Sequence, residues 1–145
     1  MPNPDLAAQA PLILVVEDNE DNRTMYAELL RVSGFQVETA VNGEDGLAKV
    51  LLHRPAVVVM DLTMPRMSGW ELTRRLKTDE RTRDARIIAV TGTGVKQTAD
   101  VARSAGCDAY LVKPCSPEIL LAEVQSQLRA WTTNQVRRAM RGLRS

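Results

Sequence analysis

Four stretches of the sequence each place a chemically capable side chain directly after a run of apolar residues. Glu17 and Asp18 follow the first run and Asp61 follows the second, while Thr91 and Lys113 follow two later ones. Carboxylates can bind a divalent cation or attack an electrophile, a hydroxyl can donate a hydrogen bond, and an ammonium can neutralise an anion. These five residues are the candidates for chemistry.

Asp61 is the central candidate. It follows the run Val57–Met60, whose apolar and mainly β-branched residues are typical of a parallel strand covered on both faces, and the turn Met64-Pro65 comes next. Taken alone, Asp61 is more simply a turn residue, because aspartate often follows a strand as turn chemistry. A functional role depends on whether the other polar strand ends meet it.

Strands and helices are expected to alternate along the chain. The expected strands are 12–16, 35–39, 56–60, 86–90 and 109–112, and the expected helices begin near residues 19, 42, 68, 96 and 117 and end near 34, 55, 78, 105 and 130. This alternation predicts an α/β fold, a doubly wound five-stranded parallel sheet of order 2-1-3-4-5, flavodoxin-like, with five flanking helices. In that order Glu17, Asp18 and Asp61 converge at one edge of the sheet.

Three converging carboxylates repel one another unless a cation lies among them. Hard oxygen ligands without histidine or thiolate favour Mg²⁺. With the metal bound, Asp61 can attack a phosphorus atom, while the Thr91 hydroxyl and the Lys113 ammonium contact phosphoryl oxygens. The strand ends therefore predict Mg²⁺-dependent phosphoryl transfer to Asp61.

Composition bounds the class of protein. The 145 residues suit one domain, and 44% apolar and 26% charged residues are ordinary globular values. No apolar run approaches the ~20 residues that cross a bilayer, and the N-terminus does not resemble a signal peptide, so we expect a cytoplasmic protein without membrane insertion. Cys107 and Cys115 lack metal-ligand spacing and are expected to be reduced, non-catalytic thiols.

Charge is distributed unevenly along the chain. The formal net charge is +1, but five arginines and no acid follow Glu123, which leaves residues 1–128 at −4. We expect a flexible N-terminal arm at 1–10, a globular domain at 11–130 and a basic tail at 131–145.

The basic tail has a pattern of its own. An apolar stripe flanked by arginines predicts a short amphipathic helix after residue 134, separate from the helix that ends near Ala130, and so short a helix must dock or fray. A solvated extension, docking on a partner or a second copy, and weak nucleic-acid binding remain open, and nucleic acid is the least expected. The stripe consists of Val136, Ala139, Met140 and Leu143.

Over residues 12 to about 130 the chain resembles the receiver domain of two-component response regulators, in particular the chemotaxis-regulator type. The matching motifs are Val-Val-Glu17-Asp18-Asn19, Met60-Asp61-Leu62-Thr63-Met64-Pro65 followed by Ser68-Gly69, Val90-Thr91-Gly92, and Lys113-Pro114.

The resemblance implies a signalling domain rather than a conventional enzyme, one that catalyses only its own phosphorylation and dephosphorylation. Asp61 would be the phospho-acceptor, supplied by a histidine kinase or a histidine phosphotransfer protein. Glu17, Asp18 and the Thr63 backbone carbonyl would share Mg²⁺ with Asp61, and Lys113-Pro114 would be a cis peptide.

The resemblance also implies a switch. Thr91 would shift toward the phosphoryl group and Tyr110 would rotate inward with it. This movement would present the surface of the fourth helix, fifth strand and fifth helix to a downstream protein target. The molecule would be a monomer or a weak, phosphorylation-dependent dimer.

Two departures from the family pattern affect the expected chemistry. Gly92 stands where alanine is usual, which keeps the backbone N–H donor but loosens the loop. Thr63 and Thr93 lack the amide or acid that would position an attacking water, so we expect phospho-Asp61 to last minutes or longer.

Other interpretations remain open at this stage. The chain could be the N-terminal receiver of a larger regulator, with an output domain after residue 145. A phosphohydrolase with an aspartyl-phosphate intermediate is less favoured, because residue 63 is not the second acid that such sites use. A dinucleotide-binding domain is weaker still, because no Gly-x-Gly-x-x-Gly follows the first strand.

Overall fold

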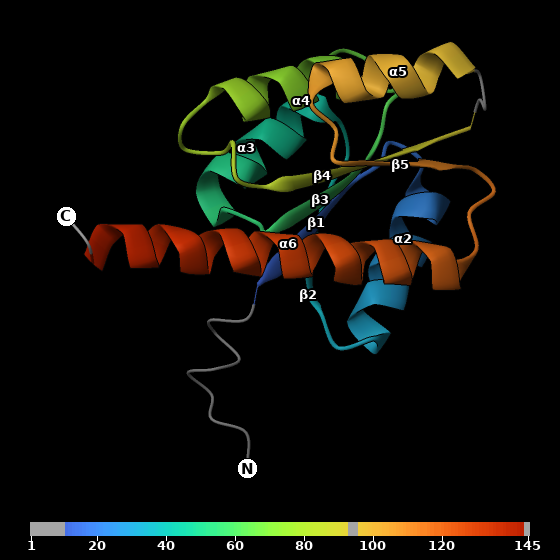
Figure 1. Cartoon of the computed structure of the whole chain (residues 1–145). Helices are drawn as coiled ribbons and strands as arrows, with labels where there is room; N and C mark the ends of the chain where they lie inside the picture. The colour runs from blue at the N-terminus through green and yellow to red at the C-terminus, as the bar shows by residue number, and fades with distance from the viewer. Residues whose placement is uncertain (1–10, 93–95, 144–145) are drawn as a thin grey trace.

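A five-stranded parallel sheet forms the centre of the molecule, in the order β2-β1-β3-β4-β5 (Figure 1). The computed structural model describes residues 11–92 and 96–143, with the backbone alone for residues 96–99, so the expected arm at 1–10 and Thr93 lie outside the described residues. The strands are β1 (Leu12–Val16), β2 (Gln36–Ala40), β3 (Val57–Asp61), β4 (Arg86–Thr91) and β5 (Ala109–Val112). The predicted fold class and strand order are confirmed.

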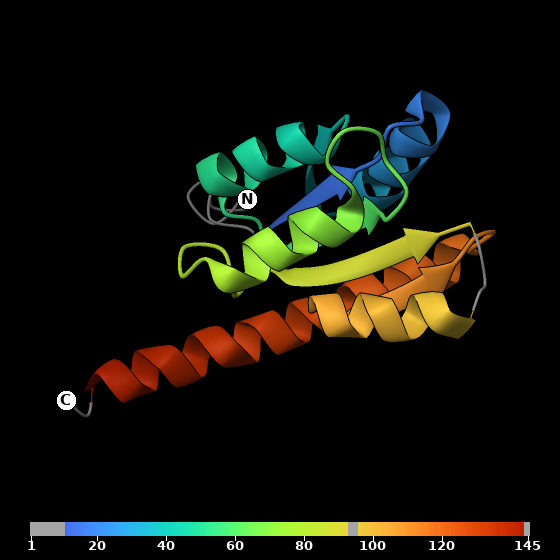
Figure 2. The ribbon, with the colours of Figure 1, turned by 90° about the horizontal axis from the view of Figure 1, so that it is seen from above.

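A helix follows each strand and packs on the sheet. The helices are α2 (Glu20–Val32), α3 (Gly43–His53), α4 (Gly69–Thr78), α5 (Lys96–Ala105) and α6 (Pro117–Leu143). Helices α2 and α6 cover one face of the sheet, while α3, α4 and α5 lie on the other (Figures 1 and 2). The result is the three-layer sandwich expected of a doubly wound sheet.

Both faces of the sheet are apolar because successive side chains of a strand point to opposite sides. Val57 and Val59 of β3 pack with residues of α2 and α6, such as Leu30 and Leu120. The alternate residues of β3 pack toward α3 and α4 on the other face. This double burial confirms that the run ending at Asp61 is a strand covered on both faces.

Side-chain caps fix where three helices begin, close to the edge of the sheet that carries Asp61. The side chains of Asn19, Asn42 and Ser68 accept hydrogen bonds from backbone N–H groups in the first turns of α2, α3 and α4. Such caps satisfy donors that have no partner within the helix. The expected starts of these helices follow from this chemistry.

The last helix differs from expectation. Helix α6 runs without a break to Leu143, so the prediction of an end near Ala130 and a separate short helix in the tail is wrong. Residues Thr132-Thr133-Asn134 do not interrupt the helix, because these residue types cost only about tenths of a kcal/mol each within a helix. Extending an existing helix also avoids the cost of starting another. Trp131 also packs against the core, and Arg138 forms an ion pair with Asp84.

The C-terminal part of α6 projects beyond the sheet (Figure 2). Within residues 11–92 and 96–143, no helix is both long enough and apolar enough to cross a membrane.

Candidate phosphoryl and metal site

Strand register brings the candidate residues to one edge of the sheet. Val16 pairs with Met60, so Glu17 and Asp61 follow neighbouring positions of β1 and β3. Thr91 pairs with Val112 on the far side, which places Lys113 next to the end of β4. All five predicted residues therefore lie at the carboxyl edge of the sheet, where open α/β sheets hold their ligands.

Three carboxylates lie together at this edge. Oxygen atoms of Glu17, Asp18 and Asp61 are all within 4.8 Å of one another. Glu17 is buried, with 2% of its surface exposed, whereas Asp61 is partly buried and Asp18 is exposed. The cluster therefore opens to solvent on the side of Asp18.

Lys113 connects two of the acids. Its Nζ lies 3.0 Å from Asp61 Oδ2 and 3.1 Å from Glu17 Oε1. Burial lowers the pKa of Lys113, but the hydrogen bonds to Asp61 and Glu17 outweigh that effect and leave the pKa above its usual value of 10.5. The ammonium therefore stays charged at neutral pH and neutralises part of the negative cluster.

Glu17 has one carboxylate oxygen that is available to bind a cation. Its Oε1 accepts hydrogen bonds from Asn22 and Lys113, whereas its buried Oε2 has no hydrogen-bond partner among the described residues. Burial raises the pKa of Glu17 above 4.5, an effect that the bonds from Asn22 and Lys113 only partly oppose. An unpartnered buried carboxylate oxygen beside two more carboxylates is the donor set that suits Mg²⁺.

The chain after Asp61 turns tightly and fixes this side chain. The backbone N–H of Thr63 donates to Asp61 Oδ1 at 2.9 Å, and Gly69 N–H donates to the Leu62 carbonyl at 3.1 Å. A Cβ on Gly69 would lie 2.5 Å from the Asp61 carbonyl oxygen, so only glycine fits there. Asp61 is thus held from two sides, with Oδ2 toward Lys113.

Thr91 and Tyr110 occupy the β4–β5 side of the site. Thr91 is buried, with 1% of its surface exposed, and its carbonyl accepts the backbone N–H of Lys113 at 2.7 Å. The Lys113-Pro114 peptide is cis, as the resemblance implied. Tyr110 is half-buried and packs against Leu62 and neighbours from β4 and α5. Thr91 and Tyr110 therefore lie on the paired strands β4 and β5, and Tyr110 is on the side of the sheet that α5 covers.

Two residues of the first turn of α2 support the site and were missed by the sequence analysis. Asn22 Nδ2 donates to Glu17 at 3.0 Å, and Arg23 donates to the Glu17 backbone carbonyl at 2.9 Å. Both follow the acid pair by about one helical turn. That spacing, with Asn19 as the cap, was the available signal that they return to the strand end.

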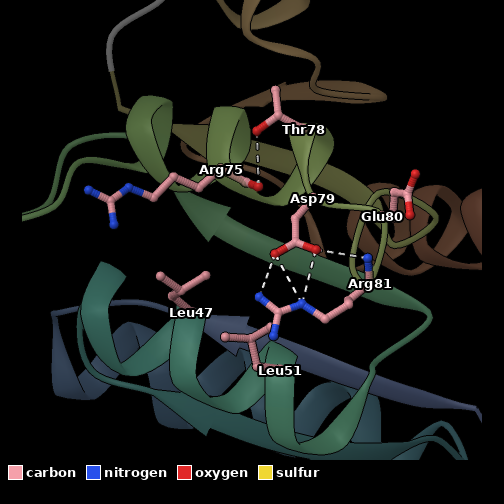
Figure 3. A pocket seen from close by; sticks show the side chains of 7 residues that line it. All are labelled: Leu47, Leu51, Arg75, Thr78, Asp79, Glu80 and Arg81. Atoms are coloured by element: carbon pink, nitrogen blue, oxygen red, sulfur yellow. Dashed lines mark hydrogen bonds and ion pairs between the residues drawn. The ribbon is translucent and has the colours of Figure 1, made fainter.

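A depression between α3 and α4 has a different character (Figure 3). Its volume is about 760 Å³, and its main polar feature is the ion pair of Asp79 with Arg81, whose hydrogen bonds lower the pKa of Asp79 to about 2. It lies at the C-terminal ends of both helices, at the opposite edge of the sheet from Asp61. Asp79 is thus occupied by Arg81, and this depression lies away from the cluster of Glu17, Asp18 and Asp61.

The two cysteines lie outside the cluster and are both free thiols. Burial raises the pKa of Cys107 and of Cys115 above 9.0. Both thiols are therefore protonated at neutral pH.

The chain is similar to known proteins in sequence and in fold. A profile of the response regulator receiver domain matches residues 13–125. The polar-differentiation response regulator DivK of Brucella anthropi is 35% identical over 116 residues, which cover 80% of this chain and 94% of DivK. The chemotaxis response regulator CheY4 of Vibrio cholerae is 30% identical with a TM-score of 0.76, over 81% of this chain and 98% of that one.

A more distant structure agrees with these. A CheY-like response regulator receiver domain protein of Methanospirillum hungatei is 27% identical with a TM-score of 0.80, over 86% of this chain and 98% of that one. The residues matched by the profile include all five strand-end residues.

Proposed function

Because the chain belongs to the response regulator receiver domain family, a family of two-component signalling domains, we propose that Asp61 accepts a phosphoryl group from a histidine kinase or a histidine phosphotransfer protein. The observation that carries the proposal is the cluster of Glu17, Asp18 and Asp61, in which the buried Oε2 of Glu17 has no hydrogen-bond partner within the described part of the chain. We further propose that this phosphoryl exchange takes place in the cytoplasm, the compartment in which free thiols persist.

In the proposed step, an oxygen of the Asp61 carboxylate attacks the phosphorus of a phosphohistidine. A P–O bond forms as the P–N bond breaks, and the imidazole nitrogen keeps the electron pair. Thr63 N–H and the Lys113 ammonium each hold one oxygen of Asp61, which limits rotation of the nucleophile before the attack. Such positioning supplies much of the rate in phosphoryl transfer.

Mg²⁺ would be held by Glu17, Asp18 and Asp61, with the Thr63 backbone carbonyl as the ligand that the family pattern adds. The metal would neutralise the carboxylates and the charge on the phosphoryl oxygens. Lys113 would pair with a second phosphoryl oxygen and Thr91 would donate its hydroxyl to a third. These roles for Thr91 and Lys113 spread the charge of the transition state over three partners.

The proposed output is a change at the face formed by α5, β5 and α6. A shift of Thr91 toward the phosphoryl group opens space beside β4, and Tyr110 lies on the neighbouring strand, packed near Leu62 and Ala102. Inward rotation of Tyr110 would alter this face. A downstream protein that prefers one state of the face would then respond to the phosphorylation of Asp61.

The proposal is tested with Mg²⁺ and a small acyl-phosphate donor by following both protein-bound and released phosphate. We expect bound phosphate to plateau at one group per chain, to require the metal and to disappear when a chelator is added first. Rapid, sustained release of phosphate from many small phosphoesters would instead identify a phosphohydrolase.

A further inference from the structure

The C-terminal part of α6 carries an apolar stripe that nothing in its own chain covers among the described residues. Val136, Met140 and Leu143 are 52%, 55% and 86% exposed and lie at i, i+4 and i+7 of the helix. Arg137 and Arg141 run along the solvent side of the stripe, and neither has an ion-pair partner within residues 11–92 and 96–143. The match to the family profile ends at residue 125, before this segment.

Helix α2 carries a second exposed apolar stripe, but the charged residues beside it are acidic where those of α6 are basic. Met25 and Val32 are 52% and 88% exposed, and with the half-buried Leu29 they form a second i, i+4, i+7 stripe. A shallow depression of about 540 Å³ follows this stripe, and the charged residues that line it are all acidic. They are Glu20, Asp21 and Glu28.

The two stripes lie on the same side of the sheet, one beyond the other. Phe35, just after α2, lines a groove with Leu128 and Thr132 of α6, so α2 ends near the point where the projecting part of α6 begins. At 1.5 Å per residue, α2 and the segment 132–143 are each about 18 to 20 Å long. The projecting segment therefore matches α2 in length but cannot reach the α2 of its own chain.

We propose that these two stripes bind each other between two copies of this chain, in a two-fold symmetric dimer. The two-fold axis would pass near residue 132, perpendicular to α6, so that the α6 helices of the two copies run in opposite directions. The segment 132–143 of each protomer then lies along α2 of its partner. The apolar stripes then bury each other, and Arg137 and Arg141 face Glu28 and Asp21. The contact occurs twice and uses the same patch on both subunits, so the assembly closes at two copies.

The charges favour a second copy over an anionic partner. A nucleic acid or an acidic membrane surface that approached the projecting arginines would also meet the acidic stripe of α2 on the same side of the molecule. Arg138, a third arginine of the segment, is already paired with Asp84. The interaction of the two stripes uses both signs of charge and does not depend on phosphorylation of Asp61.

The test is sedimentation equilibrium of the full chain and of variants over a wide range of concentration. Met140→Asp removes apolar contact from the stripe, and its matched control is Leu52→Asp, which changes a residue that is 75% exposed on α3. We expect dimers for the wild type and the control, and a loss of at least about tenfold in association for Met140→Asp.

Charge reversal tests the pairing itself. Glu28→Arg and Arg137→Glu alone should each weaken association, whereas the double variant should recover most of the wild-type affinity, with Glu80→Arg as a control on the α4–β4 loop. A wild type that stays monomeric at every concentration would overturn the proposal. So would a double variant as weak as the sum of its single changes, or a Met140→Asp variant that dimerises like its control.

Discussion

Lys113 holds two carboxylates of the site, and replacing it tests how the charge of the cluster is balanced. Lys113→Met leaves Glu17 and Asp61 without their shared cation, which we expect to lower the free energy of unfolding by about 1–3 kcal/mol in metal-free buffer. Mg²⁺ should recover more stability in this variant than in the wild type, because it then supplies the missing positive charge. Chemical denaturation with and without Mg²⁺ measures both effects, and equal gains from the metal would contradict this account of the cluster.

The raised pKa of Glu17 makes the stability of the metal-free protein depend on pH. Between pH 4.5, the pKa of an ordinary glutamate, and the raised pKa of Glu17 in the folded protein, the folded protein keeps a proton that the unfolded chain has lost. The protonation of Glu17 therefore stabilises the fold fully below pH 4.5. This contribution is lost as the pH rises through the pKa of Glu17 in the folded protein. Mg²⁺ competes with the same proton, so its stabilising effect should grow over the same interval.

Glu17→Gln should remove both trends. We expect the Tm of this variant to vary less with pH in metal-free buffer and to rise little when Mg²⁺ is added. Glu80→Gln, an exposed change in the α4–β4 loop, is the control and should behave like the wild type. A Glu17→Gln variant that gains as much Tm from Mg²⁺ as the wild type would show that Glu17 does not hold the metal.

Thr63 is placed to affect how long the phosphoryl group stays on Asp61. Its side chain lacks an amide or a carboxylate that could orient a water, so we expect phospho-Asp61 to last minutes or longer and Thr63→Asn to shorten this lifetime several-fold. Thr63→Ser keeps a hydroxyl and serves as the control. Decay is followed by intact mass after removal of the donor, and loss within a few seconds in the wild type would refute the expectation.

At the scale of the elements, the β3–α4 connection sets the geometry of Asp61. Gly69→Ala would place a Cβ 2.5 Å from the Asp61 carbonyl oxygen and 2.7 Å from Leu62 Cα, both of them backbone atoms. We expect a loss of about 1–3 kcal/mol in stability, because these atoms can move only with the strand. Gly92→Ala is the matched control for stability, since among the described residues, its chain neighbours apart, no atom lies within 4 Å of its added Cβ. Equal stabilities of the two variants would contradict this account.

The elements differ in how well local sequence predicts them. Strand β3 and the starts of α2, α3 and α4 follow from uninterrupted apolar runs and from the caps Asn19, Asn42 and Ser68, which are local signals. The end of α6 depends on Trp131 reaching the core and on the pairing of Arg138 with Asp84, which are contacts distant in sequence. A pattern of residues 131–145 alone therefore indicated a separate helix where the chain continues the previous one.

The site likewise combines features that the sequence predicts with features that depend on tertiary packing. The convergence of Glu17, Asp18, Asp61, Thr91 and Lys113 follows from strand order, because parallel strands end at the same edge. The hydrogen bond from Asn22 to Glu17, and the lack of a partner for Glu17 Oε2 among the residues that the structure describes, depend on how α2 packs against β1. Residue spacing alone does not specify that packing.

At the scale of the whole molecule, α6 joins two proposed activities at opposite edges of the sheet. Its first turns belong to the face that would respond to Asp61, and its last turns carry the stripe proposed to bind a second copy. The separation implies that loss of the dimer leaves the phosphoryl chemistry intact. The central claim, that Asp61 accepts a phosphoryl group, can therefore be tested independently of the dimer.

Intact mass tests that claim most directly. The wild type and Asp61→Asn are incubated with Mg²⁺ and a small acyl-phosphate donor, and their masses are compared. Asparagine keeps the size of the side chain but removes the nucleophilic carboxylate, so we predict that the wild type gains one phosphoryl group and the variant gains none. A wild type without the gain, or a variant that gains the same group, would contradict the account.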